Sequence, residues 1–292
     1  MIYEVNHVTH VEYDAQVRFG RFNLRLQPVP WPGQQVSGFA LTLDPAAELS
    51  TYPSAYPVIV TRAIIDEPLK ELTISSRFTV SIGDAMLDIP HEDLAIGEVG
   101  RRALAMQDLG ATAPGTYLHR SPLVPGSAEI GQWAGDLLGQ DAPVLDSALA
   151  LARRIRSEFD YDADATEADT PVADAFAMRR GVCQDFTHVL ISALRWAGLP
   201  AAYASGYLRT LPPPGKPRLV GVDAMHAWVM LWCGPQRGWM GLDPTNGCIA
   251  GADHIFVGMG RDYLDVAPID GVFIGVGAQR LTTSVDVVQV AG

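Results

Sequence analysis

Cysteine is scarce in this sequence: the 292 residues include only Cys183, Cys233 and Cys248. An odd set of cysteines with no CxxC pair does not support a disulfide framework or a structural zinc site. Basic residues are also outnumbered, because 21 lysines and arginines accompany 33 aspartates and glutamates, for a net charge of −12 without a basic cluster. This balance argues against nucleic acid as a partner.

Long apolar runs are absent as well. No run approaches the roughly 20 residues of a membrane-spanning helix, so we expect no membrane segment. The first residues, 1–7, lack the basic and apolar regions of a secretion signal, and we therefore predict a cytoplasmic protein. Hydrophobic residues still make up 48% of the chain and charged ones 18%, so a large core can be buried.

The first 90 residues alternate apolar and polar positions in short runs. The runs cover residues 3–13, 22–26, 36–43, 57–65 and 71–82, with proline, glycine and aspartate between them. A period of two is typical of half-buried strands, so we predict an antiparallel, β-sandwich-like domain over residues 1–90. His7 and His10 are three residues apart and fall on opposite faces of a strand, which argues against a metal pair.

The rest of the chain mixes helices and strands, so the whole is an α+β protein. We predict helices at 99–109 and 130–138 within a bridging segment, 91–140, and a helix at 144–159 that opens a core over residues 141–292. A proline-rich stretch, 211–218, is either a substrate-facing lid or a plain connector. The final strand, near 281–290, must join a sheet that the sequence does not identify.

One helix carries a cysteine in its first turn. Its apolar positions follow a spacing of three and four: Phe186, Val189, Leu190, Ala193, Leu194 and Ala197. The helix begins near Cys183 and ends before Gly198 and Pro200. Free N–H groups and the helix dipole favour an anion in a first turn, so the Cys183 thiol should ionise readily and act as a nucleophile. The alternative is a small buried cysteine that only fills space.

Two later strands supply partners for this thiol. His226 lies in a strand over 223–232, and Asp243 lies at the end of a neighbouring strand over 238–245. A turn at 233–237 joins these strands as a hairpin. Nucleophile, base and orienting carboxylate therefore occur in the order Cys183, His226, Asp243, which is the requirement for a catalytic triad.

The segments GVCQDFTH, DAMHAWV and GWMGLDPTNG resemble the transglutaminase-like superfamily of cysteine enzymes. More narrowly, they are similar to bacterial transglutaminase-like proteins with a β-rich N-terminal domain. Residues 252–255 and 260–263 are similar to that group too, and the resemblance is strongest from 161 to 272. It implies a papain/transglutaminase-like core with a catalytic helix packed on an antiparallel sheet. The family's catalytic residues fall on Cys183, His226 and Asp243.

These residues predict acyl transfer through a thioester. His226 would take the proton of Cys183, the thiolate would attack an amide carbonyl, and Asp243 would hold the imidazole. The backbone N–H of Cys183 is one candidate donor to the oxyanion. Gln184 and Tyr161 are candidates for the second donor.

Three more residues are candidates for substrate binding. Trp228 and Trp239 could line an acyl pocket, although aromatic residues on paired strands are commonly part of a core. Asp185 follows the nucleophile, although an acidic side chain in a first turn commonly caps free N–H groups.

We expect no cofactor and no metal. Residues 160–171 begin like a calcium loop with alternating aspartates, but Ala165 and Pro171 stand where that loop needs glycine and glutamate.

The function that these observations favour is cysteine-dependent hydrolysis of amide bonds in a peptide or protein, by a peptidase or amidase. Nothing in the sequence marks a second site for an amine. Two alternatives stay open: a transglutaminase that forms isopeptide bonds, and a non-catalytic peptide-binding module on the same fold. The sequence does not indicate an oligomeric state.

Overall fold

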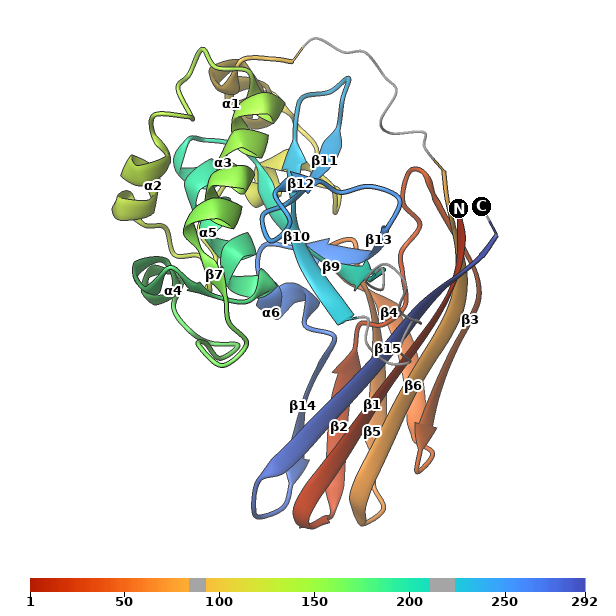
Figure 1. The fold of residues 1–292 in the computed structure, drawn as a ribbon. Helices are drawn as coiled ribbons and strands as arrows, with labels where there is room; N and C mark the ends of the chain where they lie inside the picture. Colours follow the sequence, from red (N-terminus) through yellow and green to blue (C-terminus); the bar gives the residue numbers. More distant parts are fainter. Residues whose placement is uncertain (84–92, 211–223, 292) are drawn as a thin grey trace, which may run out of the picture.

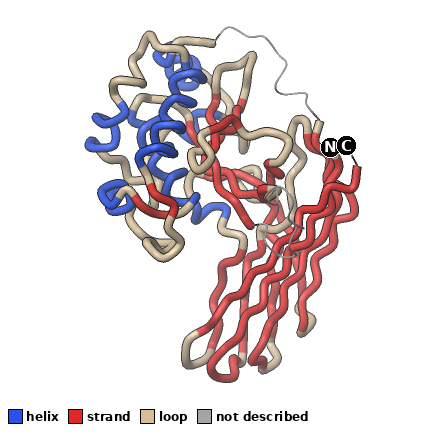
Figure 2. Tube along the Cα trace, in the orientation of Figure 1, coloured by secondary structure: helices blue, strands red, loops and turns tan. Residues whose placement is uncertain are grey.

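The computed structural model describes residues 1–83, 93–210 and 224–291, so the proline-rich stretch 211–218 lies outside the described residues. Both ends of the chain build an elongated all-β part, and the middle builds an α/β part that carries the helices (Figures 1 and 2). The two termini lie side by side, because Ile2 pairs with Ala291.

The all-β part contains two four-stranded sheets, in the orders β15-β1-β6-β3 and β14-β2-β5-β4. Its strands are β1 (Ile2–Val17), β2 (Phe19–Leu24), β3 (Gln34–Asp44), β4 (Glu48–Pro53), β5 (Ile59–Ile65), β6 (Leu69–Ile82), β14 (Ile269–Ile274) and β15 (Gln279–Ala291). Alternate residues of β1, β2, β5 and β6 form an apolar core between the sheets. The β-rich N-terminal region is therefore confirmed. The sequence missed β4, because this edge strand is mostly exposed and shows no alternation.

The last two strands of the chain belong to these sheets. β15 pairs with β1 from Ala291 opposite Ile2 to Gln279 opposite Tyr13, and β14 pairs with β2. This answers which sheet the final strand joins. Residues 269–274 and 279–291, which lie within the predicted range 141–292, thus hydrogen-bond to N-terminal strands.

The α/β part is built on a five-stranded antiparallel sheet in the order β12-β11-β10-β9-β13. Its strands are β9 (Ala201–Leu208), β10 (Ala224–Trp232), β11 (Trp239–Asp243), β12 (Cys248–Ile249) and β13 (His254–Gly260). A separate parallel pair joins β7 (Asp160–Tyr161) to β8 (Arg180–Gly181). The helices are α1 (Ile96–Ala105), α2 (Ala128–Ala134), α3 (Val144–Glu158), α4 (Val172–Met178), α5 (Cys183–Trp196) and α6 (Tyr263–Val266), with a 3₁₀ turn, η1 (Pro114–Tyr117).

Helix α5 is the centre of the α/β part. It contacts β9 and β10 of the sheet and helices α2, α3 and α4, and every residue from Asp185 to Leu194 is buried. The expected core, a cysteine-bearing helix packed on an antiparallel sheet, is confirmed. Because the helix is enclosed along its length, the position of its first turn is set by packing rather than by the loop before it.

Residues 93–140 contribute to the apolar core around α5. Val99 of α1, Tyr117 of η1 and Ile130 of α2 are fully buried in the same apolar cluster as Val189 and Leu190 of α5. These residues of the predicted bridging segment, 91–140, therefore pack against α5.

A second buried cluster joins the two parts of the molecule. Tyr3 and Phe78 of the β1/β6 sheet pack with Tyr207 of β9 and Ile255 of β13. His7 of β1 is 1% exposed, and its Nδ1 lies 3.0 Å from the Tyr207 hydroxyl. Burial lowers the pKa of His7 to about 4. The all-β part is therefore joined to the five-stranded sheet through apolar contacts and through buried polar contacts, which include His7 with Tyr207 and Gln34 with Phe256.

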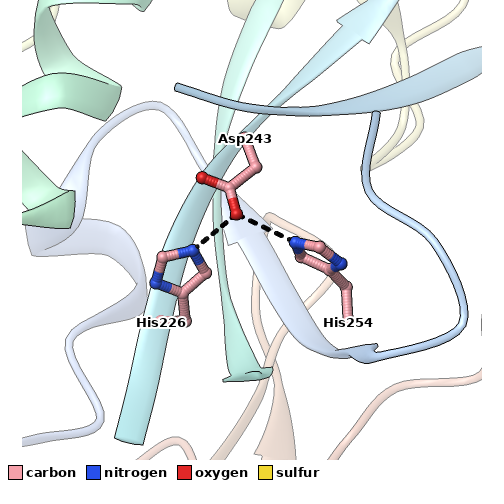
Figure 3. A group of neighbouring side chains, drawn as sticks. All are labelled: His226, Asp243 and His254. Carbon is pink, nitrogen blue, oxygen red and sulfur yellow. Dashed lines mark hydrogen bonds and ion pairs between the residues drawn. The ribbon is translucent and has the colours of Figure 1, made fainter. Parts of the chain in front are cut away.

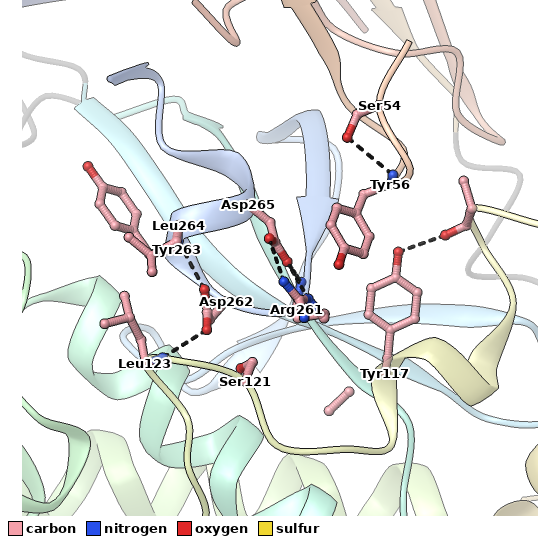
Figure 4. A network of polar contacts seen from close by, with 12 residues as sticks. Ser54, Tyr56, Tyr117, Ser121, Leu123, Arg261, Asp262, Tyr263, Leu264 and Asp265 are labelled. Atoms are coloured by element: carbon pink, nitrogen blue, oxygen red, sulfur yellow. Dashed lines mark hydrogen bonds and ion pairs between the residues drawn. The ribbon is translucent and has the colours of Figure 1, made fainter. Parts of the chain in front are cut away.

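The segment 260–263, which resembles the transglutaminase-like group, has a structural role. The Asp262 carboxylate accepts hydrogen bonds from the N–H groups of Leu123 (2.9 Å) and Leu264 (3.0 Å), and Arg261 pairs with Asp265 (Figure 4). The N–H of Tyr263 donates to Nε2 of His188, a buried residue of α5, at 3.3 Å. These bonds fix α6 and the loop after η1 against α5.

Candidate active site

The start of α5 is capped by its own aspartate. The Asp185 carboxylate accepts hydrogen bonds from the Val182 N–H (2.8 Å) and the Thr166 hydroxyl (2.7 Å), and the residue is 3% exposed. A Cβ on Gly181 would lie 2.5 Å from this carboxylate, so only glycine fits there. The Asp185 carboxylate therefore caps the start of α5, which is the alternative that the sequence analysis gave. Because these hydrogen bonds use the carboxylate, it is not free to contact a substrate.

The three residues of the predicted triad lie together. His226 Nε2 is 2.8 Å from Asp243 Oδ2 (Figure 3), and the imidazole also forms a hydrogen bond with the Cys183 thiol. Because Nε2 is bonded to Asp243, Nδ1 is the nitrogen left for the sulfur. Burial alone lowers the pKa of His226, but the hydrogen bonds to Asp243 and Cys183 outweigh it and raise this pKa to about 10. The imidazolium form is therefore strongly favoured.

Asp243 is enclosed by donors. Its Oδ1 accepts from the N–H groups of Thr245 (2.9 Å) and Asn246 (3.1 Å), and its Oδ2 accepts from the Asn246 amide (2.6 Å). His226 and His254 complete the set, with His254 Nε2 at 3.0 Å from Oδ2. The side chain is fully buried, which raises the pKa of Asp243, but these bonds and His226 hold the pKa well below its usual range. The carboxylate is therefore an anion.

Sequence reasoning gave no role to Asn246 or His254. Asn246 lies in the segment GWMGLDPTNG, three residues after Asp243, where an amide can return to the carboxylate. His254 lies in the segment 252–255 that resembles the transglutaminase-like group. Both positions were visible in the motifs, but their contact with Asp243 depends on the order of the strands.

The two candidate oxyanion donors differ in their surroundings. The Gln184 side chain donates to the Ala168 carbonyl at 2.7 Å, so it holds the loop beside α5 instead of pointing to the sulfur. Tyr161 is 61% exposed and lies next to Gly181 in the β7–β8 pair. Burial and the charge of Cys183 raise the pKa of Tyr161, which places this ring within electrostatic range of the thiol.

The two tryptophans are buried on the five-stranded sheet, Trp228 in β10 and Trp239 in β11. The Trp228 ring lies edge-on to the His254 ring at 5.3 Å, and Trp239 Nε1 donates to the Thr112 carbonyl at 3.1 Å. Both line an apolar cavity of about 110 Å³ that includes Phe256 and His254. This cavity borders His254 and is not lined by Cys183, so the tryptophans belong to the core beside the triad.

The other cysteines differ from Cys183. Cys233 is buried, and burial raises the pKa of its thiol. Cys248 pairs with Asp243 across β11 and β12, and burial followed by the charge of Asp243 raises the pKa of its thiol. Neither thiol is expected to ionise near neutral pH.

Among the described residues, one group could approach a metal ion: His226, Asp243 and His254, whose ligand atoms lie within 4.8 Å of one another. The hydrogen bonds that join them already use these atoms. We therefore assign no metal to this group.

The sequence and the fold both match known proteins. Residues 131–244 match the model of the transglutaminase-like superfamily, and residues 3–81 match the bacterial transglutaminase-like N-terminal region. The uncharacterized protein Rv2569c of Mycobacterium tuberculosis is 35% identical over 99% of this chain and 93% of its own length. The chain belongs to the transglutaminase-like superfamily.

Two further proteins are similar to this chain. The uncharacterized protein ML0607 of Mycobacterium leprae is 30% identical over 98% of each chain. A crystal structure from Cytophaga hutchinsonii, named "Putative Cysteine Protease", covers 100% of this chain and 91% of its own, with a TM-score of 0.76 at 19% identity. The structural likeness shows a shared fold, and the family supports catalysis through a cysteine.

The location of this transglutaminase-like protein stays a prediction. No helix in the described part of the chain combines the length and the apolar character needed to cross a membrane. The cytoplasmic location expected from the sequence is not tested by this observation.

Proposed function

We propose that this protein is a cysteine enzyme that cleaves amide bonds of peptides or proteins through a thioester on Cys183. The observation that carries the proposal is the continuous chain of hydrogen bonds from Cys183 to His226 to Asp243. A non-catalytic module has no chemical need for this chain, nor for a buried carboxylate with five donors.

The mechanism follows from the charges. Asp243 is an anion and favours the imidazolium of His226, and that cation in turn favours a thiolate on Cys183. The thiolate attacks the amide carbonyl, and the His226 imidazolium gives its Nδ1 proton to the leaving amine. A water molecule then loses a proton to the neutral imidazole and attacks the thioester, which releases the acid and restores the thiolate.

The tetrahedral oxyanion needs hydrogen-bond donors. The N–H of Cys183, in the first turn of α5, is one donor, because no intrahelical acceptor is available to it. The Tyr161 hydroxyl is the second donor in our proposal, since this ring lies in electrostatic range of the sulfur. The Gln184 side chain is not part of it.

Hydrolysis is favoured over transfer to an amine by the exposure of the site. Tyr161 beside the nucleophile is 61% exposed and Cys183 itself is only partly buried, so water can reach a thioester formed there. Transamidation would use the same residues, and an amine in high concentration would compete with water.

Mass spectrometry of a peptide library incubated with the protein tests the proposal, with and without a primary amine. We expect cleaved peptides in both samples, none with a Cys183→Ala variant, and full activity in the matched variant Cys233→Ala. Amine adducts as the main product would instead identify a transglutaminase. Intact peptides with the wild-type protein would leave the non-catalytic module as the better account.

A further inference from the structure

We propose that His254 is a positioning residue of this site: it donates a fixed hydrogen bond to the carboxylate oxygen that His226 also uses, and so limits the share of the Asp243 charge that reaches His226. The inference deepens the proposed function, on which it rests. His254 touches neither the sulfur nor a substrate, and acts through Asp243.

The bonds of His254 fix its tautomer. Its Nδ1 accepts the N–H of Gly251 at 3.2 Å, so the ring proton stands on Nε2, which donates to Asp243 Oδ2 at 3.0 Å. The backbone N–H of His254 returns to the Gly251 carbonyl at 3.0 Å. These bonds hold the His254 ring in one orientation, with Nε2 as the donor to Asp243.

Two imidazoles thus donate to one oxygen. His226 and His254 approach Asp243 Oδ2 from opposite sides (Figure 3), at 2.8 and 3.0 Å, and both side chains are only 8% exposed. The Trp228 ring lies near both, with its centroid 6.2 Å from that of His226 and 5.3 Å from that of His254. Packing against the Trp228 ring therefore fixes the positions of the two imidazoles relative to the Asp243 carboxylate.

The consequence for the reaction is electrostatic. Each hydrogen-bond donor to a buried carboxylate stabilises its negative charge. The donor from His254 to Oδ2 therefore weakens the electrostatic attraction between this oxygen and the imidazolium of His226. Without His254, Asp243 would hold the imidazolium more strongly. The thiolate of Cys183 would then gain stability, but His226 would give up its proton to the leaving amine less readily, because a weaker acid is a poorer general acid.

Other titratable groups around this oxygen are few among the described residues. Cys183 faces His226 from α5, and Cys248 faces Asp243 from β12. Arg153 of α3 acts on Cys248. None of these donates a hydrogen bond to Asp243. Besides His226, the side-chain donors to Oδ2 are His254 and the Asn246 amide, and His254 is the titratable one of these two.

Two variants separate the bond to Asp243 from the rest of the histidine. His254→Gln places an amide N–H near the position of Nε2 and keeps a donor for Asp243. His254→Asn places its amide near Nδ1, where it can accept from Gly251 but cannot reach Asp243. His254→Met, which has a similar volume and no donor, is the second variant if the asparagine protein does not fold.

The test is the pH dependence of Cys183 alkylation by iodoacetamide, followed by mass spectrometry. We expect the acid limb of this profile to move down by about half a unit or more in His254→Asn, and to stay in place in His254→Gln. Turnover of a cleaved peptide should fall several-fold in His254→Asn with KM unchanged. Thermal unfolding checks that the variants are folded.

Two results would overturn the inference: both variants shifting together, or neither shifting while both are folded. A merely structural histidine would lower stability and slow alkylation without moving the limb. Alkylation needs no substrate, so the result for His254 is independent of whether the amide substrates are correct. Failure of the proposed function appears elsewhere, as wild-type protein that cleaves nothing.

Discussion

The β sandwich and the five-stranded sheet β12-β11-β10-β9-β13 each bury a histidine, and they shift its pKa in opposite directions. In the sandwich, His7 is buried with two neutral partners, the hydroxyls of Tyr207 and Thr9, and burial lowers its pKa. In the five-stranded sheet, His226 is nearly as enclosed, yet Asp243 and Cys183 raise its pKa. The same side chain is thus kept neutral at one place and charged at the other, and the difference lies in whether an anion shares the cavity.

The largest effect on turnover is expected from the removal of His226, the charged histidine. His226→Ala should lower turnover by about 10²–10⁴-fold, because it removes the general acid and base. It should also abolish preferential alkylation of Cys183 over Cys233 and Cys248 near neutral pH, measured by mass spectrometry. The exposed His119, changed to Ala, is the matched control and should alter neither. Persistent selectivity would mean that the helix end alone activates the thiol.

His7, the buried neutral histidine, should make the stability of the folded protein sensitive to acid. Its pKa is about 4 when folded and about 6.5 when unfolded, so the unfolded chain binds the extra proton and stability falls as pH drops from 6.5 to 4. Unfolding in urea at pH 7 and 4.5 should show that the wild type loses about 2 to 3 kcal/mol more than His7→Gln does. Equal losses in both proteins would mean that His7 is not the titrating group.

The smallest effect is expected at the exposed rim of the site. Tyr161→Phe removes only a hydroxyl, and we expect turnover to fall about tenfold, less than the 10²–10³ typical of an oxyanion donor, because this side chain is largely in water. Stability should not change. Tyr52→Phe, on edge strand β4, is the control and should leave turnover intact; unchanged turnover in Tyr161→Phe would remove this hydroxyl from the oxyanion site.

The sequence predicted those elements whose evidence is local. Alternation along β1 and the three-and-four spacing of α5 come directly from burial of one face, so both elements were found. Cys183, His226 and Asp243 could be predicted to lie together because each lies in its own recognisable segment. The cap formed by Asp185 was foreseen as an alternative, since it depends on a residue two positions from the start of the helix.

What could not be predicted depends on contacts between distant segments. Nothing local in residues 279–291 indicates that they pair with β1 at the other end of the chain. The sequence analysis placed Val99 and Ile130 in a bridging segment, because no pattern in the neighbouring residues indicates that they are buried against α5. His254 reaches Asp243 only because β13 lies beside β9 in the sheet, an order that no residue spacing specifies.

The pairing of β15 with β1 also has a consequence for biosynthesis. One edge of β1 can pair with β6 early, but its other edge has no partner until residues 279–291 have left the ribosome. At 5–20 residues per second, this interval lasts roughly ten to forty seconds. A long unpaired strand edge is a template for association with other chains. Nascent molecules of this protein therefore pass through a period in which the unpaired edge of β1 is available for binding by a chaperone.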